Sequence, residues 1–168
     1  AGDNSRAGLN RYPEPHPLEL EARLAALYGV RADQLIAGRG SDEAIDLLVR
    51  GFCTAGRDAI LTCPPTFGMY KVAARIQGAA VVEVPLLREA GYTLDEAAIE
   101  RACTPQVKLV FFCAPNNPTG NAVDAGVIER TARRLAERAL VVVDEAYAEF
   151  AAQPSFVARL AEFPNLVV

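Results

Sequence analysis

Apolar positions along this chain of 168 residues recur with two spacings. Apolar residues three and four positions apart indicate amphipathic helices, at residues 20–28, 41–52, 66–77, 94–102, 123–138 and 155–162. Short, mostly apolar runs without alternation indicate strands buried on both faces, at residues 34–37, 59–63, 80–84, 107–113, 140–143 and 166–168. Because the two kinds of run alternate, we expect a three-layer α/β/α fold with a mostly parallel sheet.

The two ends of the chain differ from its middle. Residues 1–16 are polar and rich in glycine and proline, which is typical of an extended arm. Residues 17–168 contain no linker, repeat or low-complexity tract, so we expect one domain there. The chain stops inside the apolar run 166–168, an unusual place for a terminus. We therefore expect this chain to be part of a longer polypeptide.

Composition and charge exclude several functional classes. Hydrophobic residues make up 51% of the chain, enough for a sizeable core. The net charge of -4 and the absence of a basic cluster argue against binding to nucleic acid. No apolar run is long enough to cross a membrane, and no signal peptide is visible. These features favour a cytoplasmic protein that acts on small molecules.

The cysteines indicate structure rather than chemistry. Cys53, Cys63, Cys103 and Cys113 are too far apart for a CxxC pattern, and His16 is the only imidazole. The supply of ligands therefore argues against a metal site. Most of these cysteines lie in or beside apolar runs, which predicts buried, reduced thiols of the kind found in the cytosol.

Polar groups follow two of the apolar runs directly. Asp144 comes after the run 139–143, and the segment Pro115–Gly120 comes after the run 107–113. A carboxylate at the tip of a buried strand costs free energy unless its charge is used. In open parallel sheets, ligands bind outside the carboxyl ends of the strands. These tips therefore predict a ligand site at one edge of the sheet.

Three roles are open to Asp144 on the sequence alone. It could cap a helix that follows it, because Asp is a preferred N-cap residue. It could bind a metal, but the neighbouring sequence offers too few further ligands. It could pair with a pyridine nitrogen and keep it protonated, which makes the ring the electron sink that pyridoxal phosphate chemistry needs. Tyr147, three residues later, could then donate to the phenolic oxygen of that ring.

A second candidate site begins at a turn before a helix. Gly40, Ser41 and Asp42 lie there. Free backbone N–H groups and the helix dipole at such a point attract a phosphate. The alternative is ordinary helix capping by Ser41 or Asp42. The sequence leaves both roles open.

Two further positions could contact a ring. Phe67 is predicted at the very start of its helix, where it could stack on a planar cofactor, whereas Tyr70 is assigned to core packing. Asn117 belongs to a segment that reads by default as a tight turn around Pro118. It could also donate a hydrogen bond to a phenolate-like oxygen.

Five segments, in order along the chain, resemble the fold-type-I pyridoxal-phosphate-dependent aminotransferases and, more narrowly, the histidinol-phosphate aminotransferase family. The Asn-Pro-Thr-Gly and Asp-x-x-Tyr motifs are shared by many aminotransferases, whereas the first and third segments are more specific. The segments are Leu9–Pro15, Arg39–Ile45, Cys63–Tyr70, Pro115–Gly120 and Asp144–Phe150.

The resemblance implies the large, cofactor-binding domain of such an enzyme, with pyridoxal 5'-phosphate as cofactor. It assigns the cofactor phosphate to Gly40, Ser41 and Asp42. It places Phe67 on the face of the pyridine ring, where many relatives carry Tyr. The resemblance places this domain at residues 17–168, without its C-terminal part and without the small domain of the family.

The resemblance also implies the remaining site residues. Asn117 and Tyr147 would hydrogen-bond the ring oxygen, and Asp144 would pair with the ring nitrogen. Asp144 and Tyr147 are thus the expected catalytic residues. Tyr12 would reach across a homodimer interface toward the cofactor phosphate or substrate of the partner.

The chain departs from the family pattern at one catalytic position. The Schiff-base lysine of the family follows the strand that begins at Leu166, and neither Lys71 nor Lys108 can replace it. We therefore expect these residues alone to be inactive. The complete enzyme would interconvert histidinol phosphate plus 2-oxoglutarate with imidazole-acetol phosphate plus glutamate, in histidine biosynthesis. The alternatives are an aromatic or broad-specificity aminotransferase, a threonine-phosphate decarboxylase, or a non-catalytic ligand-binding domain.

Overall fold

The computed structural model describes residues 12, 14 and 16–168. The chain divides into two units between Gly38 and Arg39. The expected arm at residues 1–16 lies almost wholly outside the described residues, and the expected domain at 17–168 stays a prediction. In the part of the chain that the structure describes, no helix is long and apolar enough to cross a membrane.

The first unit contains helix α1, Leu18–Tyr28, and a 3-10 helix, η2, Ala32–Gln34. The strand predicted at 34–37 is wrong. Gln34 belongs to η2 instead, because its side chain accepts the backbone N–H of Arg31 at 3.1 Å and closes a local turn. Leu35 is extended, but residues 35–37 form no strand and join no sheet.

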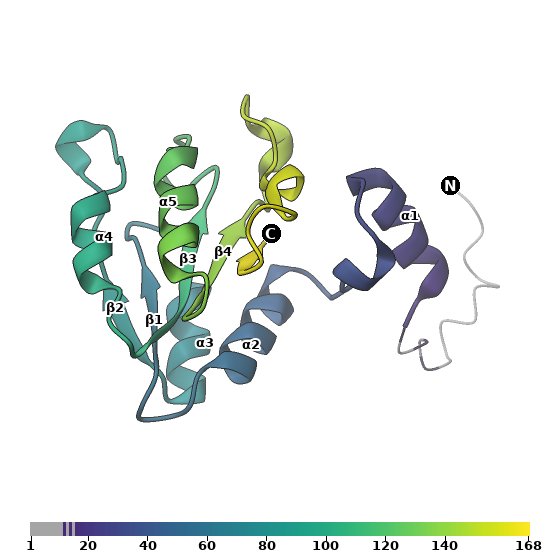
Figure 1. The fold of residues 1–168 in the computed structure, drawn as a ribbon, viewed down its shortest axis with the longest axis horizontal. Helices are drawn as coiled ribbons and strands as arrows, with labels where there is room; N and C mark the ends of the chain where they lie inside the picture. Colours follow the sequence, from purple (N-terminus) through teal and green to yellow (C-terminus); the bar gives the residue numbers. More distant parts are fainter. Residues whose placement is uncertain (1–11, 13, 15) are drawn as a thin grey trace. The chain divides into compact units, whose positions relative to one another are not determined.

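The second unit is built on one parallel sheet of five strands in the order β2-β1-β3-β4-β5 (Figure 1). All four neighbouring pairs run parallel. The sequence predicted each strand to within one residue at either end. The strands are β1 Ala59–Thr62, β2 Ala80–Glu83, β3 Val107–Cys113, β4 Leu140–Asp144 and β5 Leu166–Val167.

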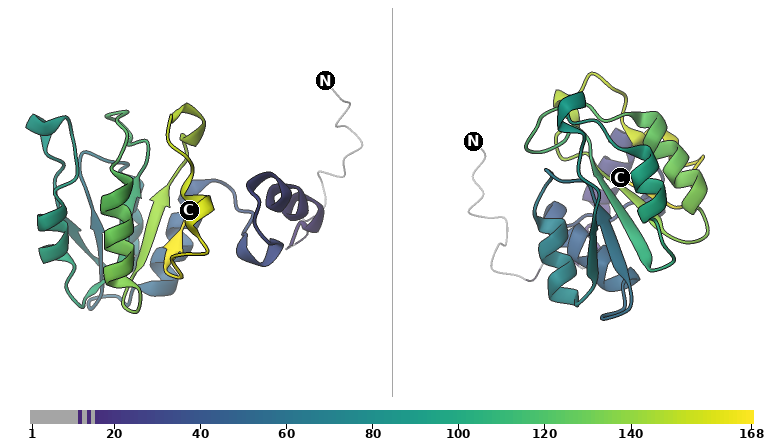
Figure 2. Two further views of the ribbon diagram at one scale, coloured as in Figure 1. Left: turned by 45° about the horizontal axis from the view of Figure 1, so that its top comes forward. Right: turned by 90° about the vertical axis from the view of Figure 1, so that its left-hand side faces the viewer.

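Helices cover both faces of the sheet, which confirms the three-layer prediction. Helices α2, Ser41–Phe52, and α3, Met69–Gln77, lie on one face. Helices α4, Glu96–Ala102, and α5, Ala125–Leu135, lie on the other (Figure 2). Three further 3-10 helices are η3 Arg88–Ala90, η4 Ala148–Phe150 and η5 Phe156–Arg159.

The helix predicted at 155–162 is mostly wrong, because only η5 forms there. The hydroxyl of Ser155 accepts the N–H of Val157 at 3.1 Å, which starts a turn. The hydrogen bonds that follow, from Leu160 and Glu162, span three residues rather than four. This tighter winding does not continue into an α-helix.

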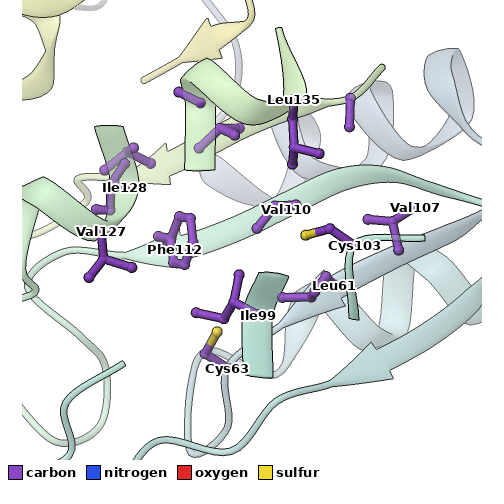
Figure 3. Packing of buried hydrophobic residues seen from close by; sticks show 14 of the residues in the cluster. Leu61, Cys63, Ile99, Cys103, Val107, Val110, Phe112, Val127, Ile128 and Leu135 are labelled. Carbon is purple, nitrogen blue, oxygen red and sulfur yellow. The ribbon is translucent and has the colours of Figure 1, made fainter. Parts of the chain in front are cut away.

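Alternate residues of β3 supply the two halves of the core. Val110 and Phe112 pack against α4 and α5 (Figure 3). Leu109, Phe111 and Cys113 point to the opposite face, against α2 and α3. This alternation follows from the two-residue period of a strand, and it determines which strand-tip side chains share a face.

The chain changes direction between β1 and β3. From β1 it passes through α3 to β2 on one side, and it returns through α4 to β3 on the other side of β1. The loops after β1 and β3 therefore leave toward opposite faces of the sheet. This is the topological switch point, where open α/β sheets bind their ligands.

Candidate functional site

Asp144 is the last residue of β4 and lies beside Cys113 of β3. By strand alternation it points to the same face as Val142, the face that α2 and α3 cover. Its Oδ2 accepts a hydrogen bond from the hydroxyl of Tyr70 at 2.6 Å, and its Oδ1 accepts the N–H of Ala146 at 3.1 Å. Each oxygen of this half-buried carboxylate keeps a further lone pair for a ligand.

The alternative that Asp144 caps a following helix is wrong. The next helix, η4, begins at Ala148, and its N-cap residue is Tyr147. The bond from Ala146 N–H to Oδ1 is a turn two residues long, of the kind that Asp side chains form with their own backbone. The orientation of the carboxylate is therefore fixed by this turn and by the hydrogen bond from Tyr70.

Tyr70 is a site residue that the sequence assigned only to core packing. It is fully buried on α3, with its ring stacked on Phe111 at a centroid distance of 4.6 Å and an interplanar angle of 13°. Burial and the neighbouring Asp144 raise the pKa of the Tyr70 hydroxyl well above its usual range. The hydroxyl therefore stays protonated and acts as a donor. The sequence offered one sign of this role: a tyrosine, rather than a phenylalanine, at a core position needs a hydrogen-bond partner for its hydroxyl.

Phe67 precedes α3 by two residues, whereas it was predicted at the start of that helix. Helix α3 begins later than expected because Thr66 is held outside it, by a bond from its hydroxyl to Asn116. The Phe67 ring is half-buried and meets the Tyr70 ring edge-on, with centroids 5.7 Å apart. Phe67 therefore lies on the same face of the sheet as Tyr70, which donates the hydrogen bond to Asp144.

The two neighbouring asparagines behave differently. Asn116 is buried, and its side chain bonds to Pro65, Thr66 and Thr119. Asn117 is half-buried, and within the described residues its side chain has no hydrogen-bond partner. The role predicted for Asn117 as a donor to a ring oxygen stays a prediction.

The start of α2 is not capped by a side chain. Its N-cap residue is Gly40, with φ of 92°, so the predicted capping by Ser41 or Asp42 is wrong. Glu43 instead accepts the backbone N–H of Arg39, at 2.7 Å, and hydrogen bonds from the Arg39 guanidinium lower the pKa of its carboxyl. The first N–H groups of a helix have no acceptor within the helix. In the part of the chain that the structure describes, no side chain accepts a hydrogen bond from those of α2, and no atom lies within 4 Å of where a Cβ would stand at Gly40.

Helix α2 also points in the right direction to serve this site. It leads through residues 53–58 into β1 and packs on the sheet, so it runs antiparallel to the strands (Figure 1). Its N-terminus consequently lies toward the carboxyl ends of the strands, as does Asp144. The structure thus brings Asp144, Phe67 and the start of α2 to one face of the sheet.

The two remaining site tyrosines are exposed. Tyr147 lies in the loop after β4, with 46% of its surface exposed. That loop is closed by Glu145, which accepts the Ser155 hydroxyl at 2.5 Å and the Phe156 N–H at 2.7 Å. Tyr12 belongs to the first unit, where its side chain is 99% exposed.

Both lysines are engaged away from Asp144. Lys71 on α3 forms an ion pair of 2.5 Å with Glu83, at the end of edge strand β2. Lys108 is the second residue of β3 and donates to the carbonyl of Pro105 at 2.9 Å, at the amino end of the sheet. The structure therefore places neither amine beside the strand tip that carries Asp144.

Known proteins match this chain over nearly its whole length. Histidinol-phosphate aminotransferase of Stenotrophomonas maltophilia (strain R551-3) is 56% identical over 170 residues, which cover 100% of this chain and 46% of that protein. Histidinol-phosphate aminotransferase of Xanthomonas euvesicatoria pv. vesicatoria (strain 85-10) is 52% identical over 164 residues, covering 96% of this chain and 45% of that protein. The chain thus spans about half the length of the curated relatives it matches.

A solved structure shares the fold. Histidinol-phosphate aminotransferase from Clostridium acetobutylicum superposes with a TM-score of 0.82 at 24% identity, over 95% of this chain and 46% of that one. This likeness establishes the fold alone. The family model for aminotransferase class I and II matches residues 3–168. The chain belongs to the aminotransferase class I and II family.

Proposed function

We propose that this chain is the cofactor-binding part of a pyridoxal-phosphate-dependent histidinol-phosphate aminotransferase. The complete enzyme would transfer the amino group of histidinol phosphate to 2-oxoglutarate, giving imidazole-acetol phosphate and glutamate. The proposed substrate is supported by the 56% identity to a histidinol-phosphate aminotransferase over the whole of this chain. The cofactor is argued separately, from the geometry at the carboxyl end of the sheet.

The residues at this site fit pyridoxal phosphate. When bound, the cofactor supplies a protonated pyridine ring that accepts electrons from the substrate carbon. Asp144 would accept a hydrogen bond from the ring nitrogen and stabilise its positive charge. Its carboxylate is suited to this, because Tyr70 fixes one oxygen while lone pairs remain for a cationic N–H.

The N-terminus of α2 would hold the phosphate of the cofactor. The space at the Cβ position of Gly40 is open, and no side chain among the described residues caps the N–H groups of the first turn. Such groups, together with the helix dipole, bind phosphate. The Ser41 hydroxyl would donate a further hydrogen bond, and the backbone N–H of Asp42 would complete this set.

Three side chains would orient the ring. Phe67 would stack on its face, and its half-buried ring is already held at one edge by Tyr70. Asn117 and Tyr147 would donate hydrogen bonds to the ring oxygen. Both side chains remain accessible for this, since Asn117 is half-buried and Tyr147 is 46% exposed.

Other parts of the assembly would complete the enzyme. The proposal assigns covalent attachment of the cofactor to a lysine outside these residues, since Lys71 and Lys108 are engaged elsewhere. It also makes the enzyme a cytoplasmic homodimer, in which Tyr12 contacts the cofactor or substrate of the partner. The four buried, free cysteines suit that reducing compartment.

Steady-state assays of the complete protein test the substrate. Histidinol phosphate, phenylalanine and threonine phosphate should be compared at saturating 2-oxoglutarate, with lyase activity assayed on threonine phosphate as well. The proposal expects kcat/KM for histidinol phosphate to exceed the others by at least about 100-fold, since lost polar contacts to a substrate are costly. A preference for phenylalanine would contradict histidinol phosphate as the substrate. Release of carbon dioxide from threonine phosphate would instead indicate a decarboxylase.

A further inference from the structure

Asn116 is the point at which the two loops of the switch point meet. It is 5% exposed and follows β3. Its Nδ2 donates to the carbonyl of Pro65 at 2.9 Å, and its Oδ1 accepts the hydroxyl of Thr66 at 3.0 Å. Pro65 and Thr66 belong to the loop after β1. One amide thus bonds twice to a loop fifty residues earlier in the chain.

The same residue also closes its own loop. Its second Nδ2 hydrogen goes to the Thr119 hydroxyl, at 2.6 Å. Its backbone N–H donates to the carbonyl of Asn121 at 3.1 Å, and its carbonyl accepts the N–H of Gly120 at 2.7 Å. Every polar group of Asn116 therefore has a partner, and a fully satisfied buried network holds its members rigidly.

Among the residues that the structure describes, only the bonds of Asn116 join these two loops. Within the described residues, no backbone–backbone hydrogen bond connects residues 64–68 with residues 114–121. Their strands run side by side, but the loops leave toward opposite faces of the sheet. Each loop has bonds to other neighbours, such as Leu86 N–H to the Pro64 carbonyl and Ala114 N–H to the Asp144 carbonyl, but among the described residues only Asn116 bonds one loop to the other.

We propose that Asn116 is a positioning residue, which sets the distance between Phe67 and Asn117 across the ring site. This inference rests on the proposed function, because it takes these two residues to be ring contacts. Phe67 directly follows Thr66, and Asn117 directly follows Asn116. The hydrogen bond between Thr66 and Asn116 therefore joins the chain neighbours of the two proposed ring contacts. Asn116 would then fix the slot for the ring before any ligand enters, and such preorganisation lowers the cost of binding.

Two variants and one control test the proposal in the complete protein. Asn116→Ala removes all three side-chain bonds, and Thr66→Val removes one of them while keeping the shape of the side chain. Asn165→Ala is the control. Asn165 is 4% exposed and its Nδ2 also donates to two carbonyls, those of Ala132 and Ala139, at the amino end of the sheet. It matches Asn116 in burial and chemistry but lies away from the site.

The first readout is amide hydrogen exchange of the protein without cofactor. Asn116→Ala should raise the exchange of the protected amides bonded to the two loops, Leu86 N–H on the Pro64 carbonyl and Gly120 N–H on the Asn116 carbonyl, by about tenfold or more, since each side-chain bond lost there weakens local closure. Asn165→Ala should leave both amides within about twofold of the wild type. The second readout is binding of pyridoxal phosphate and the visible circular dichroism of the bound ring. The dissociation constant should rise about tenfold in Asn116→Ala, less in Thr66→Val and little in Asn165→Ala, and the dichroism should change only in the first two.

The outcomes separate this inference from the proposed function. Unchanged exchange at the Leu86 or Gly120 amide of Asn116→Ala, or equal effects of Asn116→Ala and Asn165→Ala on cofactor binding, would overturn the positioning role. If Asn116→Ala does not fold, Thr66→Val decides, and wild-type exchange and dichroism in that variant would also overturn it. If the wild-type protein binds no pyridoxal phosphate, the proposed function fails, and the positioning role fails with it. The exchange data then still show whether Asn116 joins the loops.

Discussion

The hydroxyl of Tyr70 donates a 2.6 Å hydrogen bond to Oδ2 of Asp144, across 74 positions of the sequence. It joins helix α3 to the end of strand β4. The Tyr70 ring stacks on Phe111 and forms a T-shaped contact with Phe67. The orientation of the Asp144 carboxylate is therefore set by a rigid aromatic cluster.

Tyr70→Phe should keep the fold and impair turnover. The ring contacts remain, while Asp144 loses a hydrogen bond to a charged group, worth about 1.5–3 kcal/mol. We expect kcat of the complete enzyme to fall about tenfold with little change in KM, because the carboxylate is no longer held at the ring nitrogen. Steady-state kinetics and thermal melting measure the two effects.

A double-mutant cycle decides whether Tyr70 acts through Asp144. With Asp144→Ala as the second change, Tyr70→Phe should cost almost nothing further. Tyr92→Phe is the control, because the Tyr92 hydroxyl has no hydrogen bond within the described residues, and it should behave as the wild type. Independent, additive losses from Tyr70→Phe and Asp144→Ala would contradict the positioning role of Tyr70.

Ser41→Ala should separate phosphate binding from helix capping. Gly40, rather than Ser41, is the N-cap residue of α2, so the free energy of unfolding should change by less than about 0.5 kcal/mol. A capping role would instead cost about 1 kcal/mol. The dissociation constant for pyridoxal phosphate should rise about tenfold, while that for pyridoxal, which lacks the phosphate, should not change. Equal losses for both ligands would exclude a phosphate contact at Ser41.

Asp58 should make stability depend on pH in the acid range. It is buried, and a hydrogen bond from the backbone N–H of Thr54, at 2.8 Å, with help from Arg57, lowers the pKa of its carboxyl below the ordinary 3.8. A carboxyl with a depressed pKa in the folded state stabilises fully above its unfolded pKa. This stabilisation is lost as the pH falls through the lower, folded value.

The complete protein and its Asp58→Asn variant should therefore differ in melting temperature at neutral pH and converge below pH 3.8. Asp33→Asn is the control, since Asp33 pairs with Arg31 on the exposed surface, with 70% of its side chain exposed. It should change the melting temperature little at any pH. A difference for Asp58→Asn that stays constant as the pH falls would rule out the charge as its cause.

The sequence predicted the central strands well because burial on both faces determines them. Runs such as 107–113 and 140–143 are apolar on both faces, and this suits only a central parallel strand. The strand predicted at 34–37 was wrong, because hydrogen bonds between near neighbours close a turn that includes Gln34. The α-helix predicted at 155–162 was wrong for a similar reason, because the hydrogen bonds there span three residues rather than four.

The places of Asp144 at the end of a strand and of Gly40 before a helix were predictable, because their residue types suit those positions. It was not predictable where partners are distant in sequence. Tyr70 and Asn116 make their bonds to residues that only the fold brings near them. A tyrosine in a core helix and a first asparagine in a turn have common structural explanations, so neither signals these contacts by itself.

The turnover of Asp144→Asn in the complete enzyme tests the central claim most directly. The amide has nearly the size of the carboxylate but no negative charge to hold the ring nitrogen protonated. We expect kcat with histidinol phosphate to fall by at least about 100-fold, or about 2.7 kcal/mol in the barrier. The melting temperature should stay close to that of the wild type. Turnover within about threefold of the wild type, with cofactor bound, would contradict the role of Asp144 at the ring nitrogen.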